Sequence, residues 1–462
     1  MHTLAQLRAG ALAGLTRLDL SEGLTEFPAE IFDLADSLEV LNLSGNALSA
    51  LPADLPRLHK LRVLFCSDNQ FTEVPAVLGQ CPRLSMVGFK ANRIRTLPAG
   101  ALPPALRWLI LTDNQLEALP PEIGNCAKLQ KLLLAGNRLA HLPAELANCT
   151  RLELLRLAAN RLTALPAWLP QLPRLAWLAY AGNPFCAATE AAVEARHPIG
   201  TIDWAALELE EQLGEGASGV ISRARWAGAP NGPREVAVKV FKGAVTSDGL
   251  PQSELAACIS AGTHANLIPV LGKIGHHPAG AQGLVLALVG PEYGNLAGPP
   301  SLATCTRDVY APGTAFGLAA VLRLARGVAA ATAHLHAQGI LHGDLYAHNI
   351  LHAPDGTALL GDFGAAGFFD PAGPGAPALQ RLEARAFACL LDELLNHCNA
   401  PATSQVVRAL REVQRRCAQP RVADRPLFAE IEAALAAAGS AGRRAPAGPP
   451  EAAETAEPVP QQ

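Results

Sequence analysis

One hydrophobic pattern runs through the first 186 residues and returns every 22 or 23 residues. Most copies have leucines at their first, fourth and sixth positions and an asparagine at their ninth, as in Leu129, Leu132, Leu134 and Asn137. A copy this short has too few apolar residues for a core of its own, so the copies must stack and share one. The pattern therefore predicts an elongated solenoid. The asparagines are Asn46, Asn69, Asn92, Asn114, Asn137, Asn160 and Asn183.

A degenerate copy precedes these seven, with Leu15, Leu18 and Leu20, and with Gly23 where the asparagine would stand. We expect each of the eight units to form a short strand, followed by a turn whose backbone the asparagine side chain hydrogen-bonds. Leucine–proline steps should mark the return limb, because proline cannot continue a helix. The pattern resembles leucine-rich repeats, which implies an α/β solenoid over residues 1–186.

The outward positions of the short strands would carry the function of this half. They mix charged, polar and aromatic residues, which fits either ordinary solvated surface or a protein-binding concave face. Aromatic residues are enriched among interface anchors, so Trp108 and Trp177 are the better candidates, whereas Tyr180 falls on a core position. The positions are Glu39, Asn42, Arg62, Ser85, Lys90, Arg107, Trp108, Gln130, Lys131, Glu153, Arg156 and Trp177.

After residue 207 the pattern changes to alternation typical of strands, interrupted by the glycines Gly214, Gly216 and Gly219. This spacing alone also occurs in dinucleotide folds, where a helix follows the last glycine. Here residues 220–226 continue as a strand, and the next strand, residues 234–241, carries Lys239. A glycine loop between antiparallel strands lets backbone N–H groups approach phosphate oxygens, with a lysine nearby to neutralise them.

Acidic and amide residues complete a set suited to phosphoryl transfer. Glu254, on a predicted helix over residues 251–260, is the natural ion-pair partner of Lys239, and Asp248 is the alternative. Beyond an apolar helix predicted over residues 315–336, Asp344 and Asn349 stand five residues apart. Asp362-Phe363-Gly364 follows. This chemistry needs a carboxylate near the acceptor hydroxyl and oxygen ligands for Mg²⁺.

In order and spacing these motifs resemble the eukaryotic-like protein kinases, over residues 208–437. The resemblance implies an α+β two-lobed protein-kinase fold that binds ATP and Mg²⁺ between its lobes. By position, Asp344 would be the catalytic base, Lys239 and Glu254 its partners in catalysis, and Asn349 and Asp362 the metal ligands. Leu213 and the three loop glycines would contact the cofactor, while Ile221, Ala237 and Leu351 would line the adenine pocket. An apolar strand over residues 284–289 would lead into the hinge.

Several positions depart from the family pattern. Gly343 stands where regulated members carry an arginine, and Tyr346 where Ser/Thr kinases carry a lysine that contacts the γ-phosphate. The segment after Gly364 is short, with no Ala-Pro-Glu before the next helix, predicted over residues 383–395 with Glu383 in the place of an aspartate. Arg425 matches the arginine that would pair with the missing glutamate. These departures put peptide recognition in question and leave the ATP site intact.

The composition of the chain limits the partners, metal sites and cellular location that we expect. Half of the residues are hydrophobic, 17% are charged and the formal net charge is −4, which gives no electrostatic argument for nucleic acid as a partner. The ten cysteines show no paired metal-binding spacing, and Cys81, Cys126 and Cys149 occupy repeat positions expected in the core. We found no signal-peptide pattern, and charges interrupt the most apolar stretch, residues 315–340. We therefore expect a cytoplasmic protein without a membrane span.

The sequence thus predicts four segments: repeats to residue 186, a cap and linker over 187–207, a kinase domain over 208–437 and a disordered tail over 438–462. The function expected is an ATP-dependent protein kinase acting on protein hydroxyls, Ser or Thr rather than Tyr. A protein substrate or regulator would bind the concave face of the repeats. The alternative is a pseudokinase scaffold that binds ATP and mainly mediates protein–protein interaction; a small-molecule kinase is the third reading.

Overall fold

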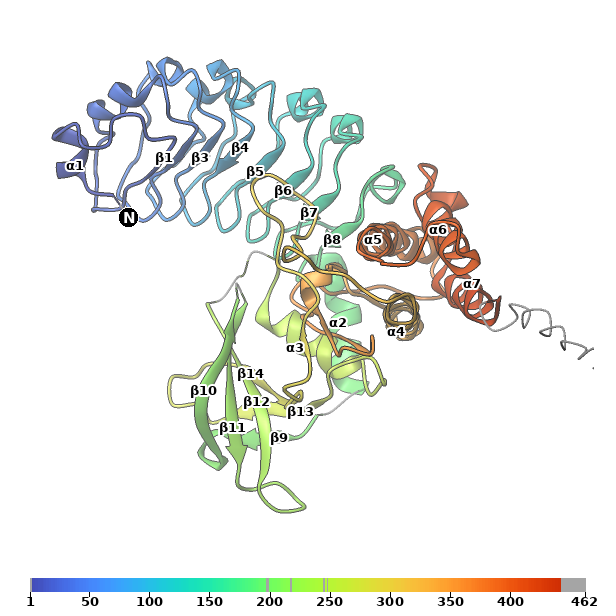
Figure 1. Ribbon diagram of the computed structural model, residues 1–462. Helices are drawn as coiled ribbons and strands as arrows, with labels where there is room; N and C mark the ends of the chain where they lie inside the picture. Colours follow the sequence, from blue (N-terminus) through green and yellow to red (C-terminus); the bar gives the residue numbers. More distant parts are fainter. Residues whose placement is uncertain (1, 197–198, 217, 244–245, 247, 442–462) are drawn as a thin grey trace, which may run out of the picture.

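The computed structural model describes residues 2–196, 199–216, 218–243, 246 and 248–441. Its first half is a solenoid whose eight strands form one parallel sheet in chain order (Figure 1). A short helix, α1 (Leu4–Arg8), precedes the first strand. The strands are β1 (Arg17–Asp19), β2 (Val40–Asn42), β3 (Val63–Phe65), β4 (Met86–Gly88), β5 (Trp108–Ile110), β6 (Lys131–Leu133), β7 (Leu154–Arg156) and β8 (Trp177–Ala179).

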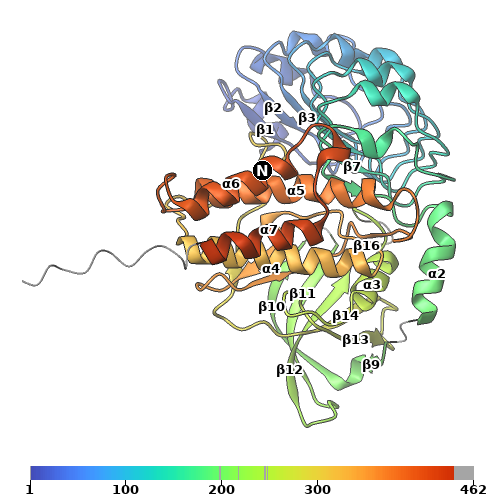
Figure 2. The ribbon, with the colours of Figure 1, turned by 90° about the vertical axis from the view of Figure 1, so that its right-hand side faces the viewer.

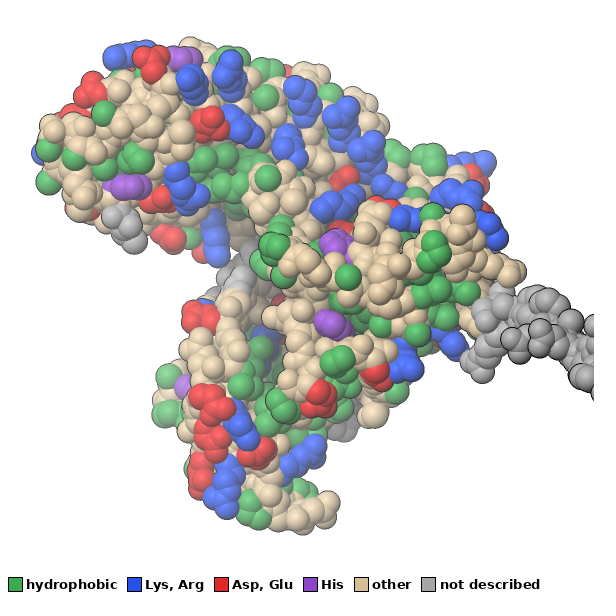
Figure 3. Space-filling model, in the orientation of Figure 1, with side chains coloured by type: hydrophobic (Ala, Val, Ile, Leu, Met, Phe, Trp, Pro, Cys, Tyr) green, Lys and Arg blue, Asp and Glu red, His purple; other side chains and the backbone are tan. Residues whose placement is uncertain are grey.

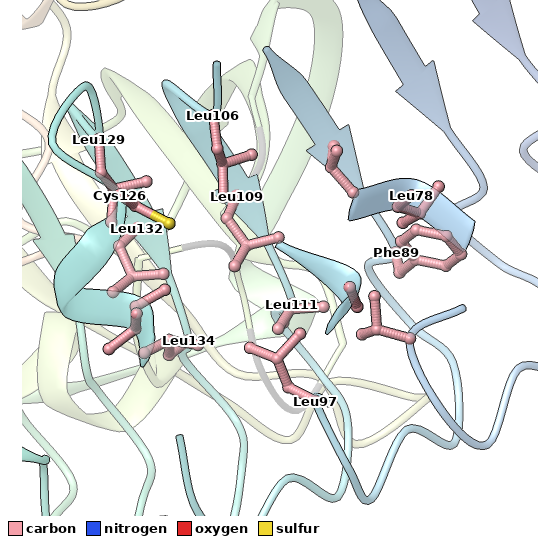
Figure 4. Packing of buried hydrophobic residues seen from close by; sticks show 14 of the residues in the cluster. Leu78, Phe89, Leu97, Leu106, Leu109, Leu111, Cys126, Leu129, Leu132 and Leu134 are labelled. Atoms are coloured by element: carbon pink, nitrogen blue, oxygen red, sulfur yellow. The ribbon is translucent and has the colours of Figure 1, made fainter. Parts of the chain in front are cut away.

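The repeating leucines form the continuous core that the pattern predicts. Leu129, Leu132 and Leu134 are fully buried and stack against the corresponding leucines of the preceding unit (Figure 4). The asparagines form the predicted ladder: Asn137 Nδ2 donates to the carbonyls of Leu111 (2.8 Å) and Leu134 (3.0 Å), and its Oδ1 accepts from the Leu116 N–H (2.9 Å). Each asparagine thus satisfies backbone groups of two neighbouring units, which fixes their register.

On the return limb, 3₁₀ helices begin directly after proline in five units, since an extended proline residue ends one segment and sets the first turn of the next. The 3₁₀ helices of the solenoid are η1 (Ala29–Leu34), η2 (Leu55–Arg57), η3 (Ala76–Gln80), η4 (Ala99–Ala101), η5 (Pro121–Asn125), η6 (Ala144–Asn148), η7 (Leu169–Gln171) and η8 (Pro184–Cys186). Cys81, Cys126 and Cys149 are buried in the core, as expected.

A cap helix, α2 (Ala187–Arg196), leads into a six-stranded sheet with the order β10-β11-β12-β14-β13-β9. Its strands are β9 (Thr201–Asp203), β10 (Leu207–Glu215), β11 (Gly219–Trp226), β12 (Arg234–Phe241), β13 (Val270–Gly275) and β14 (Gly283–Ala287), with η9 (Trp204–Ala206) after β9. The segment predicted as linker therefore contributes an edge strand, because Ile202 packs into the sheet's core beside Val236 and Val238. Residues 197–198 of that linker lie outside the described residues.

The outer face of this sheet is charged rather than apolar. Arg223 of β11 pairs with Glu210, Glu211 and Glu235, and Arg225 pairs with Glu208. Figure 3 shows the resulting strip of acidic and basic side chains on the N-terminal lobe. Exposed pairs of this kind add little stability, so the lobe depends on the apolar face between the sheet and α3 (Pro251–Ser260).

The C-terminal lobe is helical and stacks four helices (Figure 2). They are α4 (Leu318–Ala337), α5 (Ala376–Asn396), α6 (Gln405–Cys417) and α7 (Phe428–Ala441), with η10 (Ala347–Asn349) and η11 (Val422–Asp424). Two small sheets hold the loops between them: β15 (Gly294–Asn295), β17 (Ile350–His352) and β18 (Ala358–Leu360), and the pair β16 (Ile340–Leu341) and β19 (Gly367–Phe368).

Two boundaries differ most from the sequence prediction; smaller shifts place α4 at Leu318–Ala337 instead of 315–336 and β14 at Gly283–Ala287 instead of 284–289. Helix α5 begins at Ala376, earlier than the predicted Glu383, and α7 continues to Ala441, so residues 438–441 are helical rather than tail. Ala438 is buried, and alanine costs least in a helix, which explains the extension. The rest of the predicted tail, 442–462, lies outside the described residues. Helix α4 is long and apolar enough to cross a membrane, but it packs against α5, α7 and β18 within the lobe.

The two halves share their hydrophobic cores. The solenoid core includes Leu341, Phe369 and Leu382 of the C-terminal lobe, and the core of that lobe includes Leu154 and Trp177 of the solenoid. Strand β8 lies against α5, so the last repeats and the helical lobe are in direct contact (Figure 1). The repeats are therefore packed onto the second half rather than tethered to it by a linker.

Candidate functional site

Lys239 of β12 reaches across to helix α3. Its Nζ forms an ion pair with Glu254, and both side chains are buried. Asp362 Oδ1 lies 3.7 Å from the same Nζ. Burial works against the ammonium ion, but the Asp362 and Glu254 carboxylates outweigh it and raise the pKa of Lys239 above its usual value. Lys239 is therefore a permanent cation at the centre of this site, paired with Glu254 as predicted rather than with Asp248.

The loop between β16 and β17 brings Asp344 and Asn349 together. Asn349 Nδ2 donates to Asp344 Oδ2 (2.7 Å) and to the Asp344 carbonyl (2.9 Å). Beneath the loop, the N–H of Gly343 donates to the buried Glu383 carboxylate (2.7 Å), whose other oxygen lies 2.6 Å from His336 Nε2. Burial favours the neutral acid, but the contacts with His336 and Gly343 lower the pKa of Glu383. A buried carboxylate on α5 thus anchors the loop.

The residues present fit a nucleotide with Mg²⁺. Asn349 and Asp362 offer amide and carboxylate oxygens, the ligand type that Mg²⁺ prefers. Since Asn349 Nδ2 is engaged by Asp344, the amide oxygen is the atom that remains for a cation. At Gly214 and Gly216 a Cβ atom would meet nothing within 4 Å, so the loop leaves open space above its backbone. Ala217 of this loop lies outside the described residues.

Leu213 and the three residues predicted to line the adenine pocket come from both lobes. Leu213 on β10 is 49% exposed, Ile221 on β11 is half-buried and Ala237 on β12 is buried. Leu351 lies on β17 of the C-terminal lobe and is half-buried. A largely exposed leucine and two half-buried aliphatic residues leave apolar surface available to a ligand.

An arginine from the solenoid reaches this site. Arg156, the last residue of β7, is 1% exposed. Its Nε donates to Asp248 Oδ1 (2.7 Å), its Nη1 donates to the Gly343 carbonyl (2.9 Å), and its Nη2 forms an ion pair with Asp344 Oδ1. A residue from the repeats is thus bonded to the carboxylate predicted as the catalytic base.

Trp177, on β8, covers the other side of the loop. Its ring stacks on Tyr346 with centroids 4.1 Å apart and planes 7° apart, and its Nε1 donates to the Leu345 carbonyl (3.0 Å). Glu153 binds Thr306 and lies 3.1 Å from Arg307 Nη1, in the segment that joins β15 to α4. Repeats seven and eight therefore contact residues 343–346 of the loop that carries Asp344, and the segment before α4.

Comparisons with known proteins identify both domains of the chain. Residues 207–371 match the family described as protein tyrosine and serine/threonine kinase, and residues 37–58 match the leucine-rich repeat. This chain carries a leucine-rich repeat domain and a protein kinase domain. It is 27% identical over 185 residues to the serine/threonine-protein kinase mos of Xenopus laevis. The aligned stretch covers 39% of this chain and 47% of that protein.

Other relatives match the repeats or short stretches. The transforming growth factor beta activator LRRC32 of Mus musculus is 36% identical over 122 residues, 25% of this chain and 18% of that protein. The probable inactive serine/threonine-protein kinase roco10 of Dictyostelium discoideum is 33% identical over 122 residues. This stretch is 25% of this chain and 5% of that protein. The solved Leptospira interrogans LRR protein LIC12759 matches with a TM-score of 0.30 and 27% identity, over 36% and 48% of the two chains. The chain spans less than half the length of these curated relatives.

The positions at which the kinase domain departs from its family contact the repeats. A Cβ at Gly343, whose φ is +75°, would lie 2.8 Å from the Leu178 carbonyl of β8 and 2.4 Å from that of Ala365, so an arginine has no room there. Tyr346 is covered by Trp177. Arg425, also buried, donates to the Pro173 carbonyl (2.7 Å) instead of a glutamate. Burial lowers the pKa of Arg425 to about 10.

The short segment after Gly364, another departure from the family, also contacts the repeats. It consists of β19 and a turn, and Tyr180 of the repeats donates its hydroxyl to the Phe368 carbonyl (3.1 Å). The repeats thus lie against the segment whose truncation was noted in the sequence. Tyr180 is 1% exposed, in line with its predicted core position.

The prediction that the outward strand positions form one open concave face is wrong for the last units. Lys131, Glu153, Arg156 and Trp177 are all buried, because the kinase domain covers them. Of the predicted positions, Glu39, Asn42 and Arg62 in the first strands remain accessible. Of the two tryptophans predicted as interface anchors, Trp177 packs against Tyr346 of its own chain, and Trp108 is half-buried on β5.

Sequence reasoning missed two contributors. Asp308, buried before α4, accepts from the His348 N–H (3.0 Å) and lies 2.7 Å from His348 Nδ1. Burial opposes the imidazolium, but this hydrogen bond outweighs it and raises the pKa of His348. Asp308 belongs to no local motif, so nothing in the sequence signals it. The signal for Arg156 was indirect: Gly343 and Tyr346 stand where members of the family carry an arginine and a lysine.

Proposed function

We propose that this protein is an ATP-dependent protein kinase that transfers the γ-phosphate to protein hydroxyls, Ser or Thr rather than Tyr. The observation that carries the proposal is the intact buried Lys239–Glu254 ion pair in the same site as Asp344, Asn349 and Asp362. Desolvating two charges costs several kcal/mol per ion, on the order of what the pair regains, so the buried pair adds little stability and fits a role in holding Lys239 toward nucleotide phosphates.

Each residue then has one task. Lys239 would bind the α- and β-phosphates, and Glu254 would hold Lys239 in place. Asn349 and Asp362 would hold Mg²⁺, which when bound neutralises charge on the transferring phosphoryl group. Asp344 would accept the acceptor's hydroxyl proton, and the Asn349 amide keeps its carboxylate oriented. The protein would contribute mainly by positioning the reactants and stabilising charge, because phosphoryl transfer needs little covalent catalysis from protein groups.

The test is transfer of labelled γ-phosphate by the full-length protein with Mg²⁺, beside Asp344→Asn and Lys239→Met. Incorporation into protein that disappears in both variants supports the proposal, and mapping the labelled residues separates Ser/Thr from Tyr. Transfer to a small hydroxyl compound alone would replace protein by a small-molecule substrate.

A scaffold that binds ATP without transfer is the second candidate, and one contact favours it: Asp344 is already engaged by Arg156. ATP-dependent thermal stabilisation with no incorporation into protein or small acceptors would establish this alternative. The same assay therefore separates the two functions.

The open part of the solenoid is where we propose that a protein substrate or regulator binds. Strands β1 to β5 keep accessible polar positions such as Arg62, which pairs with Glu39 across neighbouring strands (3.1 Å). Charge reversal at Arg62 should weaken capture of that partner and leave transfer to a generic acceptor unchanged. We also propose a reducing, cytoplasmic setting, because the ten cysteines are free and nine of them are buried.

A further inference from the structure

Arg156 uses its whole guanidinium group on the kinase domain. It contacts the carboxylates of Asp248 and Asp344 and the carbonyl of Gly343. Its side chain is 2% exposed, against 27% for Asp248 and 16% for Asp344. A charge buried this deeply is tolerated only where hydrogen bonds and opposite charges surround it. The kinase domain provides both for this arginine, so the contact is a specific binding site.

The contact is a fixed part of the fold. Leu154, two residues before Arg156 on β7, and its register partner Trp177 on β8 belong to the hydrophobic core of the C-terminal lobe. Removing the repeats would expose that core, so the solenoid is not an inhibitor that dissociates while the kinase domain stays folded. Arg156 is therefore present whenever Asp344 is.

Asp344 retains capacity to act as a base in this state. Arg156 engages Oδ1 and Asn349 engages Oδ2, while an ionised carboxylate offers about four lone-pair positions. Both contacts hold the carboxylate in one orientation. The catalytic loop supplies no cation of its own beside Asp344 at positions 343 and 346, which are glycine and tyrosine.

A cavity of about 150 Å³ lies between β6, β7 and the catalytic loop. Arg156, Lys131, Asp344 and Tyr346 line it, with Leu133, Leu154, Asp248, Pro300 and His348. The Tyr346 hydroxyl is buried and has no hydrogen-bond partner within the part of the chain that the structure describes. A buried hydroxyl of this kind calls for a partner, and a ligand group entering the cavity would provide one.

We propose that Arg156 completes the phosphoryl-transfer site from the repeat domain: it positions the Asp344 carboxylate and supplies positive charge at a cavity that receives the acceptor hydroxyl. This inference rests on the proposed kinase function. In the transfer, the acceptor oxygen bonds to the γ-phosphorus and the bond from that phosphorus to the β,γ-bridging oxygen breaks. ADP leaves, and the acceptor's proton passes to Asp344. A fixed cation beside the acceptor stabilises the charge that develops there, as an arginine supplied from outside a catalytic domain does.

The experiment compares Arg156→Met, Arg156→Lys and wild type in the full-length protein. Arg156→Met keeps the stem and removes the charge, and it should lower kcat about 100-fold with the KM for ATP unchanged within a few-fold. Arg156→Lys should recover part of kcat, because lysine restores the charge but not the planar set of donors. Two controls should stay near wild type: Arg161→Met, an exposed arginine of the same repeat, and Tyr180→Phe, which loosens the interface away from Asp344.

A second readout needs no nucleotide. The unfolding midpoints of Arg156→Met, Asp344→Asn and the double variant form a cycle, and the shift in the double variant should be smaller than the sum of the single shifts. Additive shifts, or a kcat in Arg156→Met equal to or above that of wild type, would overturn the inference; a higher kcat would make Arg156 a restraint on the base. Absence of transfer by wild type would overturn the proposed function together with this inference, whereas equal transfer by wild type and Arg156→Met would overturn this inference alone.

Discussion

The second repeat and the last two repeats of the solenoid follow the same frame and have opposite surroundings. Val40 and Asn42 of β2 stand at the strand positions that Trp177 and Arg156 occupy in β8 and β7. The former pair is half-buried and the latter is 1% exposed. The leucine frame builds the core at both ends, while two residues per strand decide whether a unit faces solvent or another domain. A repeat domain can thus present an open surface at one end and become part of a catalytic domain at the other.

The largest expected effect comes from removing the anchor at the covered end. Trp177→Ala should lower the free energy of unfolding by about 3–5 kcal/mol, because the ring fills space against Tyr346 and carries a buried hydrogen bond. Val40→Ala, the matched change in β2, should cost about 1 kcal/mol or less. Urea unfolding of both variants measures the difference. Equal costs would mean that the covered end is no more integrated than the open end.

Next comes the carboxylate beneath the catalytic loop. Glu383→Gln should cost about 3 kcal/mol at pH 7, because it removes one partner of a buried pair. The pKa of Glu383 is lower in the folded protein than in the unfolded chain, so its contribution is present above about pH 4.5 and is lost as the pH falls through the folded value. The stability gap between wild type and variant should therefore narrow below about pH 4.5. A gap that stays constant down to pH 3 would contradict this.

A pair of glycines sharpens the comparison further. Gly343 and Gly23 have φ values of +75° and +69°, but only Gly343 meets backbone atoms at the position of a Cβ; Gly23 has nothing within 4 Å. Gly343→Ala should lower the free energy of unfolding by about 2 kcal/mol more than Gly23→Ala does. Both substitutions strain a backbone with positive φ, and only Gly343→Ala also places a Cβ too close to β8. Thermal unfolding measures the two costs. Similar values would show that β8 yields easily at this contact.

The smallest expected effect is at the hydroxyl of Tyr180. Tyr180→Phe removes one hydrogen bond to the Phe368 carbonyl and should cost about 1 kcal/mol. Amide hydrogen exchange would test where the loss falls: exchange should quicken around β19 and stay unchanged in β1 to β4. Faster exchange throughout the solenoid would indicate that this bond supports the stack as a whole.

Much of the fold was predictable because its determinants are local. The asparagine ladder, the strands of the N-terminal lobe and helix α3 follow from periodicities of a few residues, and α3 occupies the predicted bounds Pro251–Ser260. Boundaries that depend on distant contacts were missed. Strand β9 forms because Ile202 finds the core of the sheet, and α7 extends because Ala438 is covered by other helices.

In the candidate site, too, local motifs were predictable from the sequence and distant contacts were not. The sequence by itself determined which residues are candidates for the proposed transfer site, since Lys239, Asp344, Asn349 and Asp362 stand in motifs whose spacing follows from loop and strand geometry. Only the tertiary structure decided that Arg156 and Trp177 belong to that site, because they lie 188 and 169 residues before their partners Asp344 and Tyr346. Gly343, Tyr346 and Arg425 look like losses in the sequence. In the folded protein all three contact the repeats, and at Gly343 the Leu178 carbonyl lies where a larger side chain would need space.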